Sequence, residues 1–90
     1  MATHKDAMKR ARQSEEQRIR NRAYRTRMRN QVKKIRDAIA AQDLATAEAL
    51  LPQTVSILQR IASKGVIHPR NAARRIRRIA QAVQALKKQA

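Results

Sequence analysis

Residues 69–86 read Pro-Arg-Asn-Ala-Ala-Arg-Arg-Ile-Arg-Arg-Ile-Ala-Gln-Ala-Val-Gln-Ala-Leu, and this stretch shows most clearly how the chain folds. Its apolar side chains recur at intervals of four, three, four and three residues, which is the spacing of one face of an α-helix. These side chains are Ala72, Ile76, Ile79, Val83 and Leu86. Proline is favoured in a first helical turn, so we expect a helix over about residues 69–88, starting at Pro69.

The segment before this helix contains the chain's single glycine, Gly65. Glycine readily takes the left-handed conformation that ends a helix, and Asp43 is a suitable N-cap upstream. We therefore expect a second helix over about residues 43–63. Pro52 lies inside it and lacks an amide proton, which predicts a kink or a local break near residues 48–52. Its apolar face is expected to contain Leu44, Ala47, Leu51, Val55 or Leu58, and Ile61 or Ala62.

A third apolar stripe predicts a long first helix over about residues 4–41. The stripe consists of Tyr24, Met28, Val32 with Gln31 beside it, Ile35 and Ile39. Two places fit the pattern of a capping hydroxyl followed three residues later by an acid or amide: Thr3 and Ser14. We expect the start at Thr3 when the protein is bound to its partner and the start at Ser14 when it is free.

Three amphipathic helices joined by short loops form antiparallel neighbours, so the predicted fold is all-α, a three-helix bundle within one domain of residues 1–90. The first helix would be near 55 Å long and the others roughly 30 Å, at about 1.5 Å per residue. Its N-terminal half should therefore extend beyond the bundle.

Charge is grouped along the chain. The 22 Lys and Arg outnumber the 6 Asp and Glu, for a formal net charge of +16. Residues 1–36 carry +10, residues 37–59 carry −3 and residues 60–90 carry +9. Such a surface repels itself in water and requires a polyanion, so we expect a nucleic-acid partner, with an anionic membrane as the weaker alternative.

Several classes of protein do not fit this composition. Tyr24 is the single aromatic residue, whereas readers of single-stranded nucleic acid usually stack bases on exposed rings. There is no Cys, and the two His and six acids form no metal or nucleophile constellation. We expect no enzyme activity, no cofactor, no metal and no small-molecule substrate. The N-terminus lacks a signal peptide and no apolar run would span a membrane, so we expect a soluble, cytoplasmic protein.

The candidate RNA-binding residues lie in two segments that contain few or no acids. A solvated helix face normally interleaves acids as i,i+4 partners, but none follows Glu16 in the first basic block. In the first helix the candidates are Lys9, Arg10, Arg12, Arg18, Arg20, Asn21, Arg22, Arg25, Arg27, Arg29, Lys33 and Lys34. In and before the third helix they are His68, Arg70, Asn71, Arg74, Arg75, Arg77 and Arg78.

Some of these side chains have a second interpretation. His68 would either contact RNA or cap the third helix, and the residues beside it offer no catalytic partner. Asn21 and Asn71 would bond phosphate, ribose or a base edge, or face water. Tyr24 would stack on a base, or pack at the rim of the core in register with Met28.

Three parts of the sequence resemble one protein family. The first is Lys64-Gly65-Val66-Ile67-His68, the second is Ala72-Ala73-Arg74-Arg75, and the third lies within residues 21–34. Its matching positions are Asn21, Arg25, Thr26, Met28, Arg29, Val32, Lys33 and Lys34. Together these closely resemble the bacterial small-subunit ribosomal protein S20 family, over essentially the whole chain. The sequence departs from the family pattern at Pro69-Arg70, Ile76 and Gln31.

The resemblance implies a three-helix bundle that binds small-subunit (16S) ribosomal RNA directly and early in assembly. It implies a monomer within the ribosome that contacts RNA, but no membrane and no small-molecule substrate. The RNA contacts that it implies are Asn21, Arg25, Arg29, Lys33, Lys34, Lys64, His68, Arg74 and Arg75.

Two other functions compete with this one. A DNA-compacting or regulatory protein would need a recognition helix or a dimer, but each apolar stripe is already used within the bundle. A membrane-active basic helix would carry Trp, Phe or Leu on its apolar face, whereas the first helix has Ala, Met, Val and Ile.

Overall fold

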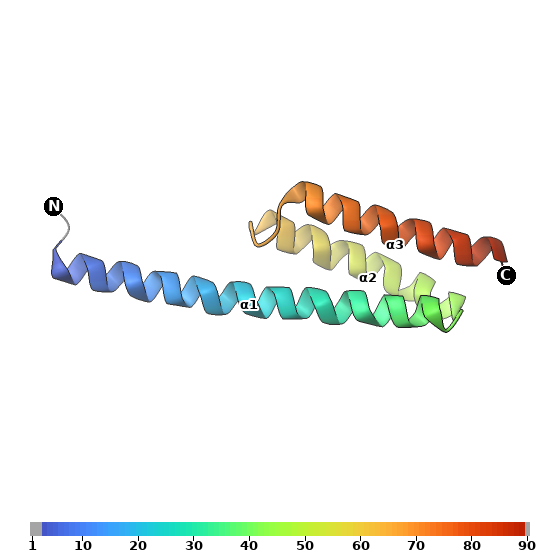
Figure 1. Ribbon diagram of the computed structural model, residues 1–90, viewed down its shortest axis with the longest axis horizontal. Coiled ribbons are helices and arrows are strands. Elements are labelled where there is room, and N and C mark those ends of the chain that lie inside the picture. Colours follow the sequence, from blue (N-terminus) through green and yellow to red (C-terminus); the bar gives the residue numbers. More distant parts are fainter. Residues whose placement is uncertain (1–2, 90) are drawn as a thin grey trace.

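The computed structural model describes residues 3–89, which form three helices joined by two short turns (Figure 1). Helix α1 spans His4–Ala40, α2 spans Leu44–Ser63 and α3 spans Pro69–Gln89. Within the described residues there is no strand. The predicted all-α fold class is confirmed.

The helices lie antiparallel in chain order, with α2 packed against both α1 and α3. α1 and α3 have far fewer contacts with each other. The molecule is elongated, measuring 65 × 20 × 15 Å, because α1 is almost twice as long as either of its neighbours. Residues 3–20 are all exposed, and this part of α1 extends past the other two helices (Figure 1). We call residues 4–20 the projecting segment.

Side-chain caps determine where α1 and α2 begin. The Thr3 hydroxyl accepts a hydrogen bond from the Asp6 amide, and the Asp6 carboxylate accepts one from the Thr3 amide, both at 3.3 Å. This capping box is the earlier of the two predicted starts of α1. At α2, Asp43 accepts bonds from the Thr46 hydroxyl and the Thr46 amide, which lower the pKa of the Asp43 carboxyl.

Left-handed residues end both α1 and α2. After α2, Gly65 has φ +78°, its amide donates to the Ala62 carbonyl and the Val66 amide donates to the Ile61 carbonyl. This is a Schellman motif, which leaves Val66 buried against the core. The end of α1 has the same hydrogen-bond pattern, but a non-glycine residue, Gln42, takes the left-handed conformation with φ 57°.

Replacement of Gln42 by glycine is expected to stabilise the fold. A Cβ atom makes the left-handed conformation costly, and glycine removes that cost at the expense of more freedom in the unfolded chain. We expect Gln42→Gly to raise the free energy of unfolding by about 0.5–1 kcal/mol in urea denaturation. Gln84→Gly, in the exposed interior of α3, is the control and should lower it by about 1 kcal/mol. A destabilised Gln42→Gly variant would contradict this account of the turn.

The proline inside α2 does not break the helix. α2 continues from Leu44 to Ser63 through Pro52, so of the two expected outcomes, a kink or a local break, the break does not occur. Because proline has no amide proton, the carbonyl four residues earlier, that of Glu48, loses its hydrogen-bond donor. Both Pro52 and Glu48 are exposed, and water can therefore satisfy that carbonyl while the helix continues.

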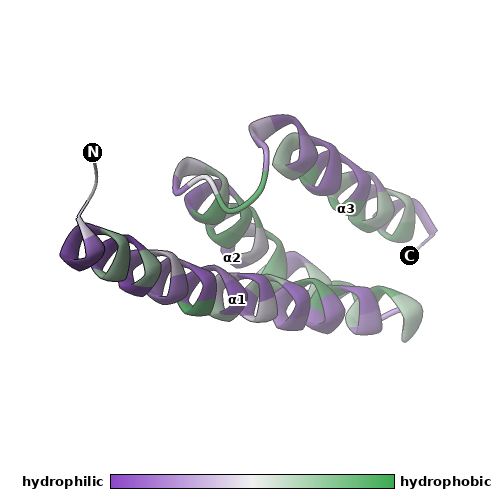
Figure 2. Ribbon diagram, turned by 60° about the vertical axis from the view of Figure 1, so that its left-hand side comes forward, coloured by the Kyte–Doolittle hydropathy of each residue, from purple (hydrophilic) through white to green (hydrophobic). Residues whose placement is uncertain are grey.

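One apolar core joins the three helices. Ile35 of α1 and Leu58 of α2 are completely buried, and Ile61, Ile79 and Val83 pack with them. In Figure 2, α2 is the most hydrophobic helix, and α3 has a hydrophobic and a hydrophilic side. The predicted stripe of α3 is buried except for Ile76, which is half-buried and packs against the core. The hydrophilic side of α3 is thereby left for solvent or a partner.

The α1–α2 contact differs from the predicted stripes because it contains a polar pair. Gln31 and Thr54 are buried, while the predicted Ile39 is only half-buried; of the predicted alternatives Val55 and Leu58, Leu58 is the buried one. The Gln31 amide donates to the Thr54 hydroxyl at 3.2 Å, and that hydroxyl donates to the Leu50 carbonyl at 2.9 Å. A buried amide is acceptable only when it is hydrogen-bonded, so this pair fixes the register of α1 on α2.

Candidate nucleic-acid interface

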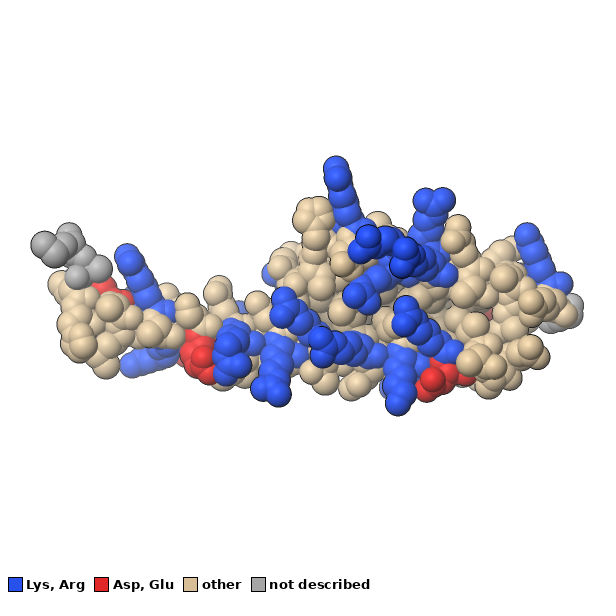
Figure 3. Space-filling model, viewed as in Figure 1, with Lys and Arg blue, Asp and Glu red and all other residues tan. Residues whose placement is uncertain are grey.

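The predicted RNA-binding residues lie at the surface. Seventeen of the twenty are exposed, and Asn21, Asn71 and Arg75 are half-buried. Figure 3 shows Lys and Arg side chains along α1 and over α3 on one face of the molecule. Acidic side chains are sparse on the same face. The long, flexible cationic side chains of two helices, α1 and α3, are therefore accessible to a polyanion.

Few of these cations have an acidic partner. Within residues 3–89 there are two ion pairs, Arg18 with Glu15 at 2.6 Å and Lys87 with Glu48 at 4.0 Å. The Arg18 guanidinium lowers the pKa of the Glu15 carboxyl by hydrogen bonding and by its charge. Among the predicted contacts, Arg18 is therefore the one for which an RNA phosphate would compete with a carboxylate, that of Glu15. An exposed pair of this kind has little strength and would yield to a phosphate.

The projecting segment presents charge over most of its circumference. Lys9, Arg10, Arg12, Arg18 and Arg20 are exposed on it at different angles around the helix axis. It has no contact with a core, since every residue from 3 to 20 is exposed. A helix of this kind suits a space with phosphates on several sides.

On α3 the predicted contacts are arranged around one internal hydrogen bond. The Arg75 Nε donates to the Asn71 Oδ1 at 2.6 Å, one helical turn away. This bond orients the guanidinium of Arg75 and occupies the carbonyl oxygen of Asn71. The neighbouring arginines, Arg70, Arg74, Arg77 and Arg78, are exposed.

His68 is the N-cap of α3. Its Nδ1 accepts a hydrogen bond from the Arg70 amide at 3.1 Å, and its carbonyl accepts from the amides of Asn71 and Ala72. The imidazole is exposed, so its Nε2 stays accessible. Of the two interpretations of His68, capping is the one that the structure contains, and a contact to RNA would have to use the other nitrogen.

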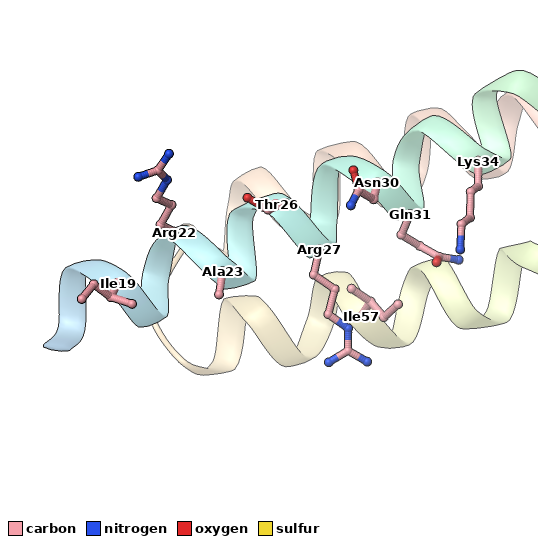
Figure 4. A pocket seen from close by; sticks show the side chains of 9 residues that line it. All are labelled: Ile19, Arg22, Ala23, Thr26, Arg27, Asn30, Gln31, Lys34 and Ile57. Carbon is pink, nitrogen blue, oxygen red and sulfur yellow. The ribbon is translucent and has the colours of Figure 1, made fainter.

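A groove lies between α1 and α2, with a volume of about 680 Å³ (Figure 4). Arg27 points from α1 toward α2 beside Ile57, and Lys34 points toward α2 beside Gln31, whereas Arg22 points away (Figure 4). Two exposed polar side chains that line this groove, Thr26 and Asn30, are not among the predicted contacts. Arg22, Thr26 and Asn30 follow one another at intervals of four residues, and this helical spacing was the available signal.

A second hollow lies where the turn after α2 meets α1, with a volume of about 550 Å³. It brings together residues that are distant in sequence, and its lining consists of Gln17, Arg20, Asn21, Tyr24, Lys64, Gly65 and Val66. The Lys64 ammonium lies 5.4 Å from the centroid of the Tyr24 ring. Tyr24 is half-buried and packs against the core, so of its two interpretations the structure favours packing at the rim.

The two basic helices do not form one continuous site. The projecting segment extends away from α3, and α1 and α3 have few contacts even where they run side by side (Figure 1). The hollow joins Arg20 and Asn21 to Lys64, but no arginine of α3 is part of its lining.

Two other kinds of site are missing from the described part of the chain. Residues 3–89 contain no group of three or more His, Cys, Asp or Glu side chains that is arranged to hold a metal ion. None of the three described helices has the length and apolarity needed to cross a membrane.

Comparisons with known proteins agree with one another. A family model described as ribosomal protein S20 matches residues 2–84. A relative in Desulfatibacillum aliphaticivorans is 50% identical over 86 residues, which cover 96% of this chain and 98% of the relative. Relatives in Syntrophobacter fumaroxidans, at 49% identity, and Desulfovibrio desulfuricans, at 48%, are matched over their full length and over 96% and 99% of this chain. All three relatives are called small ribosomal subunit protein bS20.

Proposed function

Because the chain belongs to the ribosomal protein S20 family, we propose that it binds small-subunit (16S) ribosomal RNA directly and helps that RNA to assemble. The chain is a structural constituent of the small ribosomal subunit, and the family is not enzymatic. It acts as a single copy, without cofactor, metal, membrane or small-molecule substrate. Its mechanism is electrostatic and geometric, and no bond is made or broken.

One observation carries the proposal: exposed cations without acidic partners cover two separate helices. Of the predicted contacts, only Arg18 lies in an ion pair within the described residues. Unpaired Lys and Arg release bound counterions from RNA when they replace them at phosphates, and this release drives binding. Arginine also holds two phosphate oxygens at once through its planar fork.

The shape of the molecule gives these charges their role in assembly. The projecting segment, with 17 residues, is about 25 Å long and can enter a gap between RNA helices. The bundle, with the arginines of α3, would remain at the mouth of that gap. One protein would thus neutralise and hold several RNA helices whose phosphates otherwise repel one another.

Footprinting tests the proposal directly. Purified small-subunit ribosomal RNA is probed with and without the protein, at about physiological salt and with excess duplex DNA as competitor. Protection of a few discrete RNA sites is the expected result. Diffuse protection that the DNA abolishes would overturn the proposal and favour a general DNA- and RNA-compacting protein.

The salt dependence of binding is a quantitative prediction. If about ten of the cations meet phosphates, the logarithm of the affinity should fall against the logarithm of salt concentration with a slope of about −7 to −9. Filter binding between about 0.05 and 0.3 M salt measures this slope. A slope near −2 would contradict the extended contact surface, because only two or three phosphates would then be neutralised.

A further inference from the structure

The hollow between α1 and the turn after α2 contains chemistry that favours an anion. Arg20 and Lys64 contribute exposed cations, and Gln17 and Asn21 contribute side-chain amides that can donate hydrogen bonds. No acidic residue is part of its lining. Two cations and two amide donors around one concave space match the oxygens of a phosphate.

A base is a poorer occupant of the same hollow. Base recognition by single-strand binders depends on an aromatic face to stack on. The one aromatic ring here, Tyr24, already has the Lys64 ammonium 5.4 Å from its centroid, and it is half-buried against the core. The position of Lys64 over this ring holds a cation at the edge of the hollow rather than a free ring face.

The hollow exists only in the folded bundle. Gln17, Arg20 and Asn21 lie at helical spacings of three, one and four, so α1 presents them on one face. Lys64 comes from the end of α2, and the Schellman bonds of Gly65 and Val66 with the burial of Val66 fix its position. A phosphate held from both sides would bind the folded turn and not the unfolded one.

From this geometry we infer that the hollow binds a single RNA phosphodiester. Arg20 and Asn21 contact it from α1, and Lys64 contacts it from the turn. The inference rests on the proposed RNA binding and makes it more specific. Most cations of α1 would then each contact a different phosphate, whereas Arg20, Asn21 and Lys64 would contact the same one. Binding at this point also locks the turn against α1.

A double-mutant cycle tests the inference on the full chain with small-subunit ribosomal RNA. Arg20→Gln and Lys64→Gln should each weaken binding about tenfold, as expected for a hydrogen bond to a charged group. If both side chains hold one phosphate, the double variant should bind RNA about 10- to 20-fold more weakly than the wild type. Independent contacts would instead weaken binding about 100-fold. The matched control combines Arg20→Gln with Arg74→Gln, an exposed predicted contact on α3 outside the hollow, and the losses of affinity from its two substitutions should multiply.

A second measurement does not depend on any variant. The side-chain amide signals of Gln17 and Asn21 are followed by NMR while the RNA fragment protected in the footprint is added. We expect both signals to shift and the exposed Gln84 amide to stay in place.

The possible failures are distinguishable. Effects of Arg20 and Lys64 that multiply to about 100-fold, or unmoved amides of Gln17 and Asn21, would overturn the shared phosphate and leave RNA binding intact. Absence of discrete protection by the wild-type protein would instead overturn the proposed function. Circular dichroism melts of each variant ensure that the comparison is made between folded proteins.

Discussion

A chain that starts at Ser14 is expected to bind small-subunit ribosomal RNA about 100-fold more weakly than the full chain at about 0.15 M salt. The deletion removes three proposed phosphate contacts, Lys9, Arg10 and Arg12. Each contact contributes about 0.7–0.9 to the salt slope, which at this salt corresponds to about fivefold in affinity. The slope should therefore become less negative by about 2–3.

The same deletion should leave the bundle intact, which separates RNA binding from folding. No residue before Asn21 is buried or half-buried among those described, so the deletion removes no core contact. Ser14 and Gln17 fit a second capping pattern at the new helix start. The thermal midpoint should change by no more than a few degrees.

Filter binding and a circular dichroism melt measure the two effects. Lys87→Gln with Lys88→Gln is the control, because it removes two exposed cations that are outside the proposed interface. A truncated chain that binds within about threefold of the full chain would show that residues 4–13 of the projecting segment do not contact phosphates.

Much of this fold is predictable because its signals are local. A helix start needs only a hydroxyl and an acid three residues apart, as at Thr3 and Asp6, and a helix end needs only a residue that tolerates positive φ, as at Gly65. The apolar stripe of α3 is equally local, and its spacing alone predicts the buried side. Charge grouping is also a property of the sequence, and it indicates a polyanionic partner whatever the arrangement of the helices.

The features that the sequence did not predict depend on contacts between helices. Gln31 lies beside the predicted stripe and Thr54 outside the predicted face, but both are polar, so periodicity does not show that they pair with each other in the core. Arg20 and Lys64 are both predicted contacts, but nothing local indicates that they share a hollow. That requires the turn at Gly65 to place Lys64 beside Tyr24.

Leu58→Ala is expected to be the most destabilising of the substitutions considered. Leu58 is completely buried in α2, the helix that packs against both others. Truncation of a buried leucine removes apolar contacts and leaves a cavity, at a cost of about 3 kcal/mol in the free energy of unfolding. A small domain typically has only about 5–10 kcal/mol in total, so much of the stability of the bundle would be lost. Ile19→Ala, at a position 56% exposed, is the control and should change it by less than about 0.5 kcal/mol.

RNA should restore much of the stability that Leu58→Ala removes, because the proposed RNA-binding surface exists only in the folded chain. A ligand that binds the folded state at 100 times its dissociation constant adds about 2.7 kcal/mol, close to the cost of Leu58→Ala. Without RNA, the variant should therefore melt far below the wild type. With ribosomal RNA in excess, the variant should melt close to the RNA-free wild type. Its apparent affinity should fall in proportion to its folded fraction, while the salt slope stays the same. Melts followed by circular dichroism, with and without RNA, measure both effects. An RNA-bound variant that melts as early as the free one would show that binding does not require the bundle.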